Sequence, residues 1–234
     1  NDDARRLLGI GTTPLDALRI DTLLPGMPLS AGSWEGSALA LSGGSPTVRV
    51  STSIAEGPLV ERTHIVIDVT ESRANEAQLR TLAEHDALTG LLNRRSFVDR
   101  LDEAVQHRAE AGGAVLFIDL DGFKAINDTL GHAAGDQVLE RLADALTNRL
   151  RRGDVIGRIG GDEFAVLQEG TDDRGALALG NQVLRIVRGL MTHVNGVAVT
   201  LGASIGVAVF PRDGASAELL LQRAKGASRF ARVL

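Results

Sequence analysis

The sequence predicts an α/β (α+β) fold in which a mixed central sheet is covered by helices, with a smaller α+β domain in front of it. Three patterns indicate this fold. Residues 113–119 form a continuous apolar run, as expected of a buried central strand. Apolar residues recur at helical spacing from Val138 to Leu150. Two short apolar stretches within residues 154–167 flank a Gly-Gly turn, which is typical of a hairpin.

Residues 1–70 predict a small domain of their own, rich in Gly, Ser and Pro. Residues 2–8 have a helical pattern, whereas residues 48–53 and 64–68 alternate apolar and polar side chains as strands do. Because these strands are short and alternating, we expect an antiparallel sheet with one covered face.

Residues 71–85 predict a charged linker helix, with Thr70 as its expected N-cap. Leu79, Leu82 and Ala83 give this helix an apolar seam. Two interpretations stay open, because two heptads are too few to separate them. The segment is either a surface linker helix or a short parallel coiled coil that joins two copies of the chain.

Residues 86–234 predict the larger domain, in which strands alternate with helices. After the hairpin we expect a helix around residues 175–189, a strand over 197–209 and a final helix from about Ala217.

One segment, residues 189–210, is long enough to span a membrane and carries His193 as its only ionisable side chain. Asn195-Gly196 is a hairpin signal, however, and the residues that follow alternate as a strand does. We therefore expect strands here and no membrane span. The net charge of −5 argues against a nucleic-acid partner, and the lack of cysteine fits a cytoplasmic protein.

Acidic residues at two turns suggest metal chemistry. Asp119 ends the apolar strand, and Asp162 and Glu163 lie in the turn of the predicted hairpin. Carboxylates that converge from strand ends suit Mg²⁺ or Mn²⁺, which bind through one or two carboxylates and substrate phosphates. The alternative is that Asp119 and Asp121 only cap a strand-to-loop turn.

Residues 119–136 concentrate polar side chains between the buried strand and a long helix. Lys124 could steady phosphate charge, against the alternative of a solvated helix lysine. Asn127 and Asp136 have the donor and acceptor geometry that reads a purine edge, against ordinary capping roles. His132, which follows Gly131, is more often a turn residue than a ligand.

The chain resembles the GGDEF family through four motifs that occur in the family's order and spacing: residues 86–97, 119–136, 160–164 and 204–211. This resemblance covers about residues 84–234 and implies a nucleotidyl-cyclase-like fold. It also implies the condensation of two GTP molecules into cyclic di-GMP and two pyrophosphates, in a head-to-head homodimer.

The resemblance also implies roles for single residues. Asp119, Asp162 and the Leu120 carbonyl would hold the metal ions. The acids Asp162 and Glu163 would activate the attacking 3′-hydroxyl. The side chains that would contact the nucleotide are Asn127 and Asp136 at guanine, His132 near the nucleotide, Lys124 at the phosphates, and Phe123, Gly160 and Gly161 around them.

Arg151 and Asp154 lie ahead of Gly160 where many family members carry an Arg-x-x-Asp site for product inhibition. The resemblance implies that cyclic di-GMP binds there as an inhibitor, held by the arginine fork. Without the resemblance, the two residues would be only a basic helix end followed by an acid in a turn.

The end of the chain departs from the family pattern, Ala-Asp-x-Ala-Leu-Tyr-x-Ala-Lys followed by Gly-Arg-Asn. Aligned with residues 224–232, this pattern places Arg232 where the phosphate-binding lysine belongs. The departure keeps a second function open: a catalytically weak module that binds GTP or cyclic di-GMP and regulates a longer protein with a phosphodiesterase domain.

The N-terminal region resembles a PAS sensor module in residues 1–9 and in residues 65–71, which end in an Asp-x-Thr exit. The first two strands of that fold would lie before residue 1. We therefore expect a PAS-like sensor over residues 1–70 that regulates the catalytic domain through the linker helix.

Overall fold

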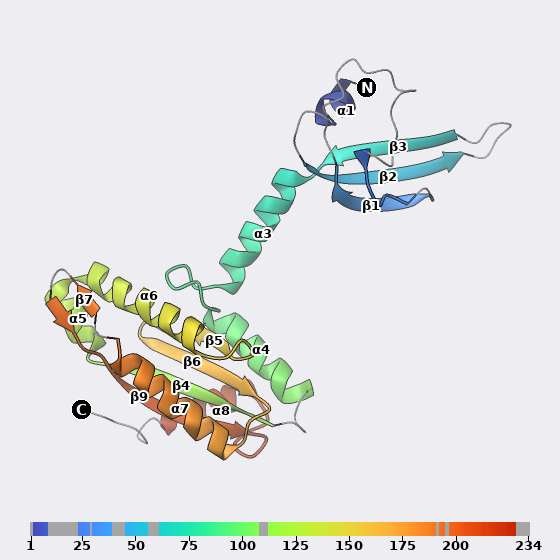
Figure 1. Ribbon diagram of the computed structural model, residues 1–234. Helices are drawn as coiled ribbons and strands as arrows, with labels where there is room; N and C mark the ends of the chain where they lie inside the picture. The colour runs from blue at the N-terminus through green and yellow to red at the C-terminus, as the bar shows by residue number, and fades with distance from the viewer. Residues whose placement is uncertain are drawn as a thin grey trace. The chain divides into compact units, whose positions relative to one another are not determined.

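The computed structural model describes residues 2–8, 23–28, 30–38, 45–55, 61–107, 112–190, 192–194 and 197–227 (Figure 1). The chain divides into two compact units, Asn1–Arg80 and Thr81–Leu234. Each unit has hydrophobic clusters of its own.

The N-terminal unit contains a three-stranded antiparallel sheet in the order β1-β2-β3. Val48 and Val50 lie on its covered face with Leu24, whereas Ile65 and Ile67 are exposed. The strands expected over 48–53 and 64–68 are therefore confirmed. β1 was not expected, because two glycines and two serines mask its alternation. The elements of this unit are α1 (Asp2–Leu7), β1 (Gly32–Ser37), β2 (Thr47–Ala55) and β3 (Glu61–Asp68).

Helix α3 (Thr70–Glu84) begins directly after β3 and buries none of its side chains. The capping role predicted for Thr70 is wrong. Its hydroxyl oxygen instead accepts a hydrogen bond from the Thr47 amide at 2.9 Å, which ties the helix to β2. The Thr70 amide donates to the Asp68 carboxylate at 2.9 Å, so the side-chain cap comes from the preceding strand. Arg73 pairs with Glu35 on β1 and holds the first turn of α3 against the sheet.

The C-terminal unit is built on a four-stranded sheet in the order β5-β6-β4-β9. Its strand pairings are antiparallel, and a single parallel bridge, Leu92 to Gly157, lies at the β5 edge of the described sheet. The predicted fold class, α+β with helices covering a mixed central sheet, is confirmed, although parallel pairing is limited to that one bridge among the described residues. The elements of the sheet and its covering helices are α4 (Arg94–His107), β4 (Gly113–Asp121), α5 (Phe123–Leu130), α6 (His132–Arg149), β5 (Val155–Arg158), β6 (Glu163–Glu169), α7 (Asp173–Arg188), β9 (Gly202–Phe210) and α8 (Ala217–Gly226).

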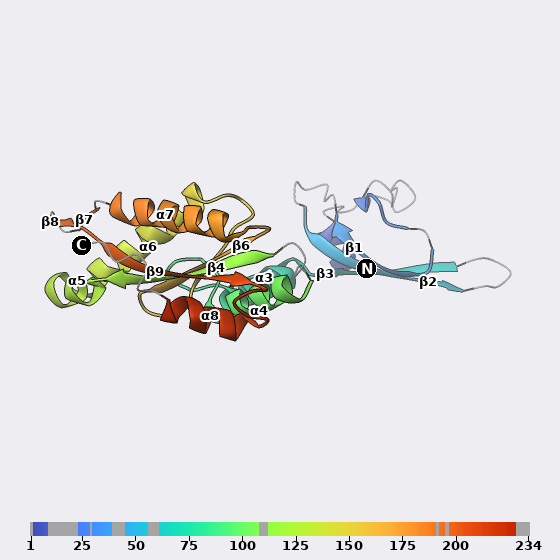
Figure 2. The same ribbon diagram turned by 90° about the horizontal axis from the view of Figure 1, so that it is seen from below.

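The central strand β4 is buried on both faces, as its continuous apolar run predicts. Leu116 and Ile118 face α6 and α7, whereas Val115 and Phe117 face α4 and α8. The sheet is therefore the middle of three layers (Figure 2). Buried packing on both faces fixes the register of β4, and that register positions the polar residues at its end.

The segment that was long enough to span a membrane forms strands. β7 (Thr192–Val194) and β8 (Val197–Val199) pair as an antiparallel hairpin, and β9 follows after a break at residues 200–201. The single strand predicted over 197–209 is thus two strands. Within the described parts of the chain, no helix combines the length and the apolar character that crossing a membrane requires.

Candidate active site

The acidic residues of the predicted site meet where β4 ends and β6 begins. In the sheet register Asp119 is the partner of Glu163 on one side and of Ser204 on the other. The Leu120 amide donates to the backbone oxygen of Asp162 at 3.3 Å. Residues more than forty positions apart in the sequence are thus brought to one end of the sheet.

The acids repel one another. Burial raises the pKa of the Asp119 carboxyl above its ordinary value, and the negative charges of Asp162, Glu163 and Asp121 raise it further. The positive charge of Lys225 acts in the opposite direction. A cluster of carboxylates that resists ionisation in this way is suited to receive a cation.

Asp119→Asn is expected to stabilise the fold, although it removes one of the predicted metal-binding carboxylates. A carboxyl whose pKa is raised by folding binds its proton more tightly in the folded state than in the unfolded state. It therefore lowers the stability of the fold as the pH rises above the pKa that it has in the unfolded chain. The variant should therefore melt at a higher temperature than the wild type in EDTA, by a margin that grows as the pH rises from the ordinary aspartate pKa through the raised pKa of Asp119 and stays constant above it. Added Mg²⁺ should reduce this difference in melting temperature, because it should stabilise the wild type. Thermal unfolding followed by circular dichroism tests this, and a variant less stable than the wild type across that pH range would contradict it.

The donor set fits a hard divalent cation. Asp119 and Asp162 offer carboxylate oxygens and Leu120 offers a backbone carbonyl, and Mg²⁺ takes ligands of both types. Among the described residues, no three ionisable ligand side chains converge in metal-binding geometry. This arrangement is consistent with a site that substrate phosphates complete.

The Gly-Gly turn ahead of the acids is held by Arg158. Its guanidinium donates to the backbone oxygens of Gly160 (3.2 Å) and Gly161 (2.7 Å) and to the Asp86 carboxylate (3.0 and 3.3 Å). Asp86 also accepts hydrogen bonds from the amide and hydroxyl of Thr89. Burial alone would raise the pKa of Asp86, but these bonds outweigh it and hold that pKa below its ordinary value. Arg158 was not singled out from the sequence.

Lys225 is a second residue that the sequence analysis missed. From α8 its Nζ reaches the Glu163 Oε1 at 2.6 Å and lies 5.3 Å from the centroid of the Phe117 ring. The sequence does contain a signal for this lysine. The family's nine-residue pattern Ala-Asp-x-Ala-Leu-Tyr-x-Ala-Lys fits residues 217–225, with Ala217, Ala224 and Lys225 at its first, eighth and ninth positions. Arg232, which we expected in this role, lies outside the described residues.

The predicted nucleotide contacts lie on two successive helices. Phe123 is the buried first residue of α5, Lys124 is exposed beside it, and Asn127 is half-buried one turn later. His132 and Asp136 are exposed in the first turns of α6. Asn127 has an unusual environment: its Oδ1 is buried, and among the described residues it accepts no hydrogen bond.

The predicted inhibitory pair lies between α6 and β5. Arg151 donates from Nε to the Asp154 carboxylate at 2.7 Å and from Nη2 to the Glu169 carbonyl at 2.8 Å. Gln168 also donates to Asp154, whose side chain is only 1% exposed, whereas the Arg151 side chain is 55% exposed. The buried acid thus orients an accessible guanidinium.

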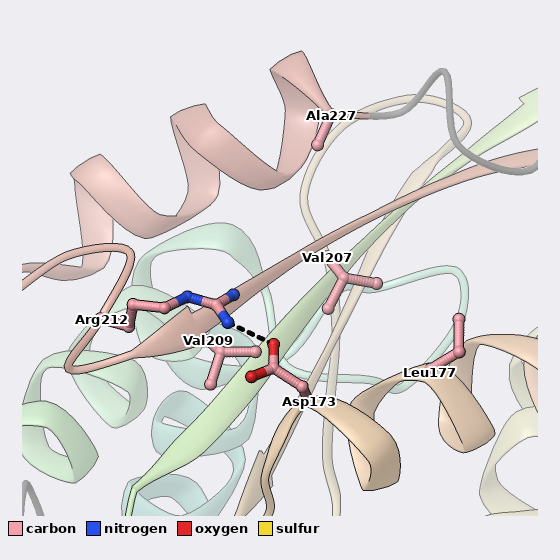
Figure 3. A pocket seen from close by; sticks show the side chains of 6 residues that line it. All are labelled: Asp173, Leu177, Val207, Val209, Arg212 and Ala227. Atoms are coloured by element: carbon pink, nitrogen blue, oxygen red, sulfur yellow. Dashed lines mark hydrogen bonds and ion pairs between the residues drawn. The ribbon is translucent and has the colours of Figure 1, made fainter.

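A hollow of about 350 Å³ opens elsewhere, beside the edge strand β9 between α7 and the end of α8 (Figure 3). An ion pair of 2.5 Å between Arg212 and Asp173 closes one side of it. None of the acids of the candidate site lines it, so it is separate from the predicted chemistry. Its lining residues are Asp173, Leu177, Val207, Val209, Arg212 and Ala227.

Fold and site define the class of the C-terminal unit as a nucleotidyl-cyclase-like α+β domain. The chain belongs to the family of diguanylate cyclase GGDEF domains, whose sequence pattern matches residues 83–232.

Relatives share more than this domain. The chain is 40% identical over 201 residues to an uncharacterized signaling protein of Caulobacter vibrioides, a match that covers 81% of this chain and 25% of that protein. It is 37% identical over 182 residues to the bifunctional diguanylate cyclase/cyclic di-GMP phosphodiesterase MucR of Pseudomonas aeruginosa, covering 77% of this chain and 26% of MucR. The chain therefore spans about a quarter of the length of these curated relatives.

A solved structure resembles the chain as well. It is the coiled coil and GGDEF domain of DgcB from Caulobacter crescentus in complex with c-di-GMP, with a TM-score of 0.63 and 27% identity. The likeness covers 69% of this chain and 86% of that one.

Proposed function

We propose that this chain is a Mg²⁺-dependent diguanylate cyclase that condenses two GTP molecules into cyclic di-GMP and two pyrophosphates. The observation that carries the proposal is the acidic cluster at the end of β4, where Asp119 and Asp162 meet with Glu163 paired to Lys225. GGDEF-family membership and a bifunctional cyclase relative support the same chemistry.

In this proposal the chain's residues bind GTP, orient it and accept a proton from its 3′-hydroxyl. Asp119, Asp162 and the Leu120 carbonyl would hold Mg²⁺, which would neutralise phosphate charge. Asn127 and Asp136 read the guanine edge, with Phe123 packed beneath and His132 nearby. Lys124 stabilises the phosphates, and the turn at Gly160 and Gly161 lets the backbone approach them.

The bond changes balance in each half of the reaction. The 3′-oxygen of one GTP forms a bond to the α-phosphorus of the other, and the bond to the bridging oxygen of pyrophosphate breaks. Glu163, with Asp162 beside it, accepts the proton of the hydroxyl. Lys225, whose side chain is 59% exposed, exchanges its ion pair with Glu163 for a phosphate.

A homodimer follows from this chemistry, because the second GTP must be presented by a second copy. Leu79 and Leu82 lie three residues apart on α3 and are 67% and 61% exposed, so they form an apolar seam that a parallel coiled coil would bury. We propose that residues 71–85 form that coiled coil, as a link between residues 1–70 and the catalytic domain 86–234.

We infer a PAS-like sensor in residues 1–70. The Asp-x-Thr exit supports it, since Asp68 binds the Thr70 amide and Thr70 accepts from the Thr47 amide, which fixes the start of α3 to the sheet. A signal that moves this sheet would thereby move the linker helix.

One assay decides the catalytic proposal: the protein is incubated with GTP and Mg²⁺, and the products are separated by chromatography. Cyclic di-GMP is expected. No product at any protein concentration, together with binding of cyclic di-GMP, would instead favour a regulatory module of a longer protein with a phosphodiesterase domain. Two relatives that are named as cyclic di-GMP phosphodiesterases, PdeR of Escherichia coli (35% identical) and NbdA of Pseudomonas aeruginosa (40% identical), favour that second function.

Arg151→Ala is expected to relieve product inhibition, because the accessible guanidinium next to Asp154 is the proposed grip on cyclic di-GMP. The concentration of cyclic di-GMP that halves the initial rate should rise at least about tenfold, as expected for loss of a charge-assisted contact. The rate without added product should stay within about twofold. Arg152→Ala, an exposed neighbour, is the matched control. Equal inhibition of Arg151→Ala and wild type would refute the site.

A further inference from the structure

Gly135, in the first turns of α6, is buried against the side chain of Asn127. A Cβ added at Gly135 would lie 2.0 Å from Asn127 Oδ1 and 3.0 Å from both Asn127 Cγ and Phe123 Cζ. The first distance is far below any real Cβ contact, and Phe123 closes the other side. An alanine here therefore has to expel the Asn127 amide or separate α5 from α6.

The need for glycine at this position is steric. Gly135 does not adopt the left-handed backbone that favours glycine, in contrast to Gly131 at φ 85°. Glycine stabilises a helix less than alanine does, so helix propensity alone would favour alanine. What the glycine provides is room for the amide of Asn127.

Within the described part of the chain, packing against Gly135, and not a hydrogen bond, holds the oxygen of that amide. Asn127 Oδ1 is buried and accepts no hydrogen bond among the described residues, which is a costly arrangement that most proteins avoid. The Asn127 amide packs directly beside Gly135, and Gly135 precedes Asp136, the second proposed base-reading residue. On α6, the glycine that accommodates Asn127 is therefore adjacent to Asp136, the other proposed base-reading residue.

We propose that Gly135 is a positioning residue for base recognition, which holds Asn127 in the orientation that reads guanine by leaving the space its amide occupies. This inference rests on the proposed function, because it takes Asn127 and Asp136 as the guanine contacts. It adds a determinant of base specificity that does not itself touch the base.

The test compares binding of two nucleotides that lack the attacking hydroxyl, 3′-deoxy-GTP and 3′-deoxy-ATP, to the full 234-residue chain with Mg²⁺. For Gly135→Ala the Kd of 3′-deoxy-GTP should rise about tenfold or more, while the Kd of 3′-deoxy-ATP changes little. In turnover the KM for GTP should rise, with kcat within about threefold. The matched control is Gly180→Ala, a buried helical glycine whose Cβ would meet Leu116 at an ordinary 3.9 Å.

A double variant separates positioning from folding. Asn127→Ala removes the amide that the new methyl group would strike, so adding Gly135→Ala to it should cost no further affinity and should restore any stability lost by Gly135→Ala alone. Additive losses, a double variant that fails to fold, or a lowered melting temperature with unchanged base preference would each overturn the inference. If the wild type itself does not bind 3′-deoxy-GTP, the proposed function fails. If it binds and Gly135→Ala binds equally, only the role of Gly135 fails.

Discussion

Asp162→Asn is expected to lower the rate of cyclic di-GMP formation by about 1,000-fold. Asparagine keeps the shape of the side chain and removes the charge that the proposed metal site requires. The turn that carries residue 162 is fixed by backbone contacts, since its own carbonyl accepts the Leu120 amide. The fold should therefore persist.

The measurement is the initial rate of cyclic di-GMP production over a range of Mg²⁺ concentrations, together with the melting temperature. The variant should melt no lower than the wild type, because one of the charges that raise the pKa of Asp119 is gone. Asp144→Asn, at an exposed position of α6, is the control and should retain full activity. Undiminished product from Asp162→Asn would remove this residue from the proposed mechanism.

Arg158→Met is expected to destabilise the C-terminal unit by about 3 kcal/mol and to reduce turnover as well. The change removes the charged partner of Asp86 and the donors to the carbonyls of Gly160 and Gly161. The Arg158 and Asp86 side chains are only 14% and 25% exposed, so the remaining carboxylate is left unpaired in a partly buried site. Without the hydrogen bonds from Arg158, the Gly-Gly turn no longer holds Asp162 in place.

Urea unfolding followed by circular dichroism measures the loss of stability. Tryptophan fluorescence would not report on the C-terminal unit, because the single tryptophan, Trp34, lies in the N-terminal unit. Arg141→Met, on the exposed face of α6, serves as the control and should cost under about 0.5 kcal/mol. The Asp86→Asn/Arg158→Met double variant should be more stable than Arg158→Met alone, since it removes the unpaired charge. Equal stability of Arg158→Met and the double variant would show that the unpaired charge of Asp86 costs no stability.

Local pattern predicted most of the elements. The apolar run at 113–119 became β4, the Gly-Gly turn joined β5 to β6, and the helix expected around 175–189 is α7. The pattern did not predict β1, because its glycines and serines show no alternation of apolar and polar residues. It was also wrong at Thr70, whose hydroxyl accepts a hydrogen bond from β2 instead of capping the helix. In both cases contacts with a neighbouring strand outweighed local preference.

The candidate site divides in the same way. Asp119, Asp162 and Glu163 were predicted because they follow a buried strand or a tight turn, which are signals contained in a few consecutive residues. Lys225 and Arg158 were missed. Each acts across the fold, Lys225 on Glu163 from 62 positions away and Arg158 on Asp86 from 72.

Periodicity and short motifs were enough to predict the α+β class, the family and the acids of the candidate site. They could not predict which charges face one another, why an alanine does not fit at Gly135 or how Arg158 holds the turn. These depend on the register of β4 between β6 and β9 and on the packing of α5 against α6, which side chains far apart in the sequence set together.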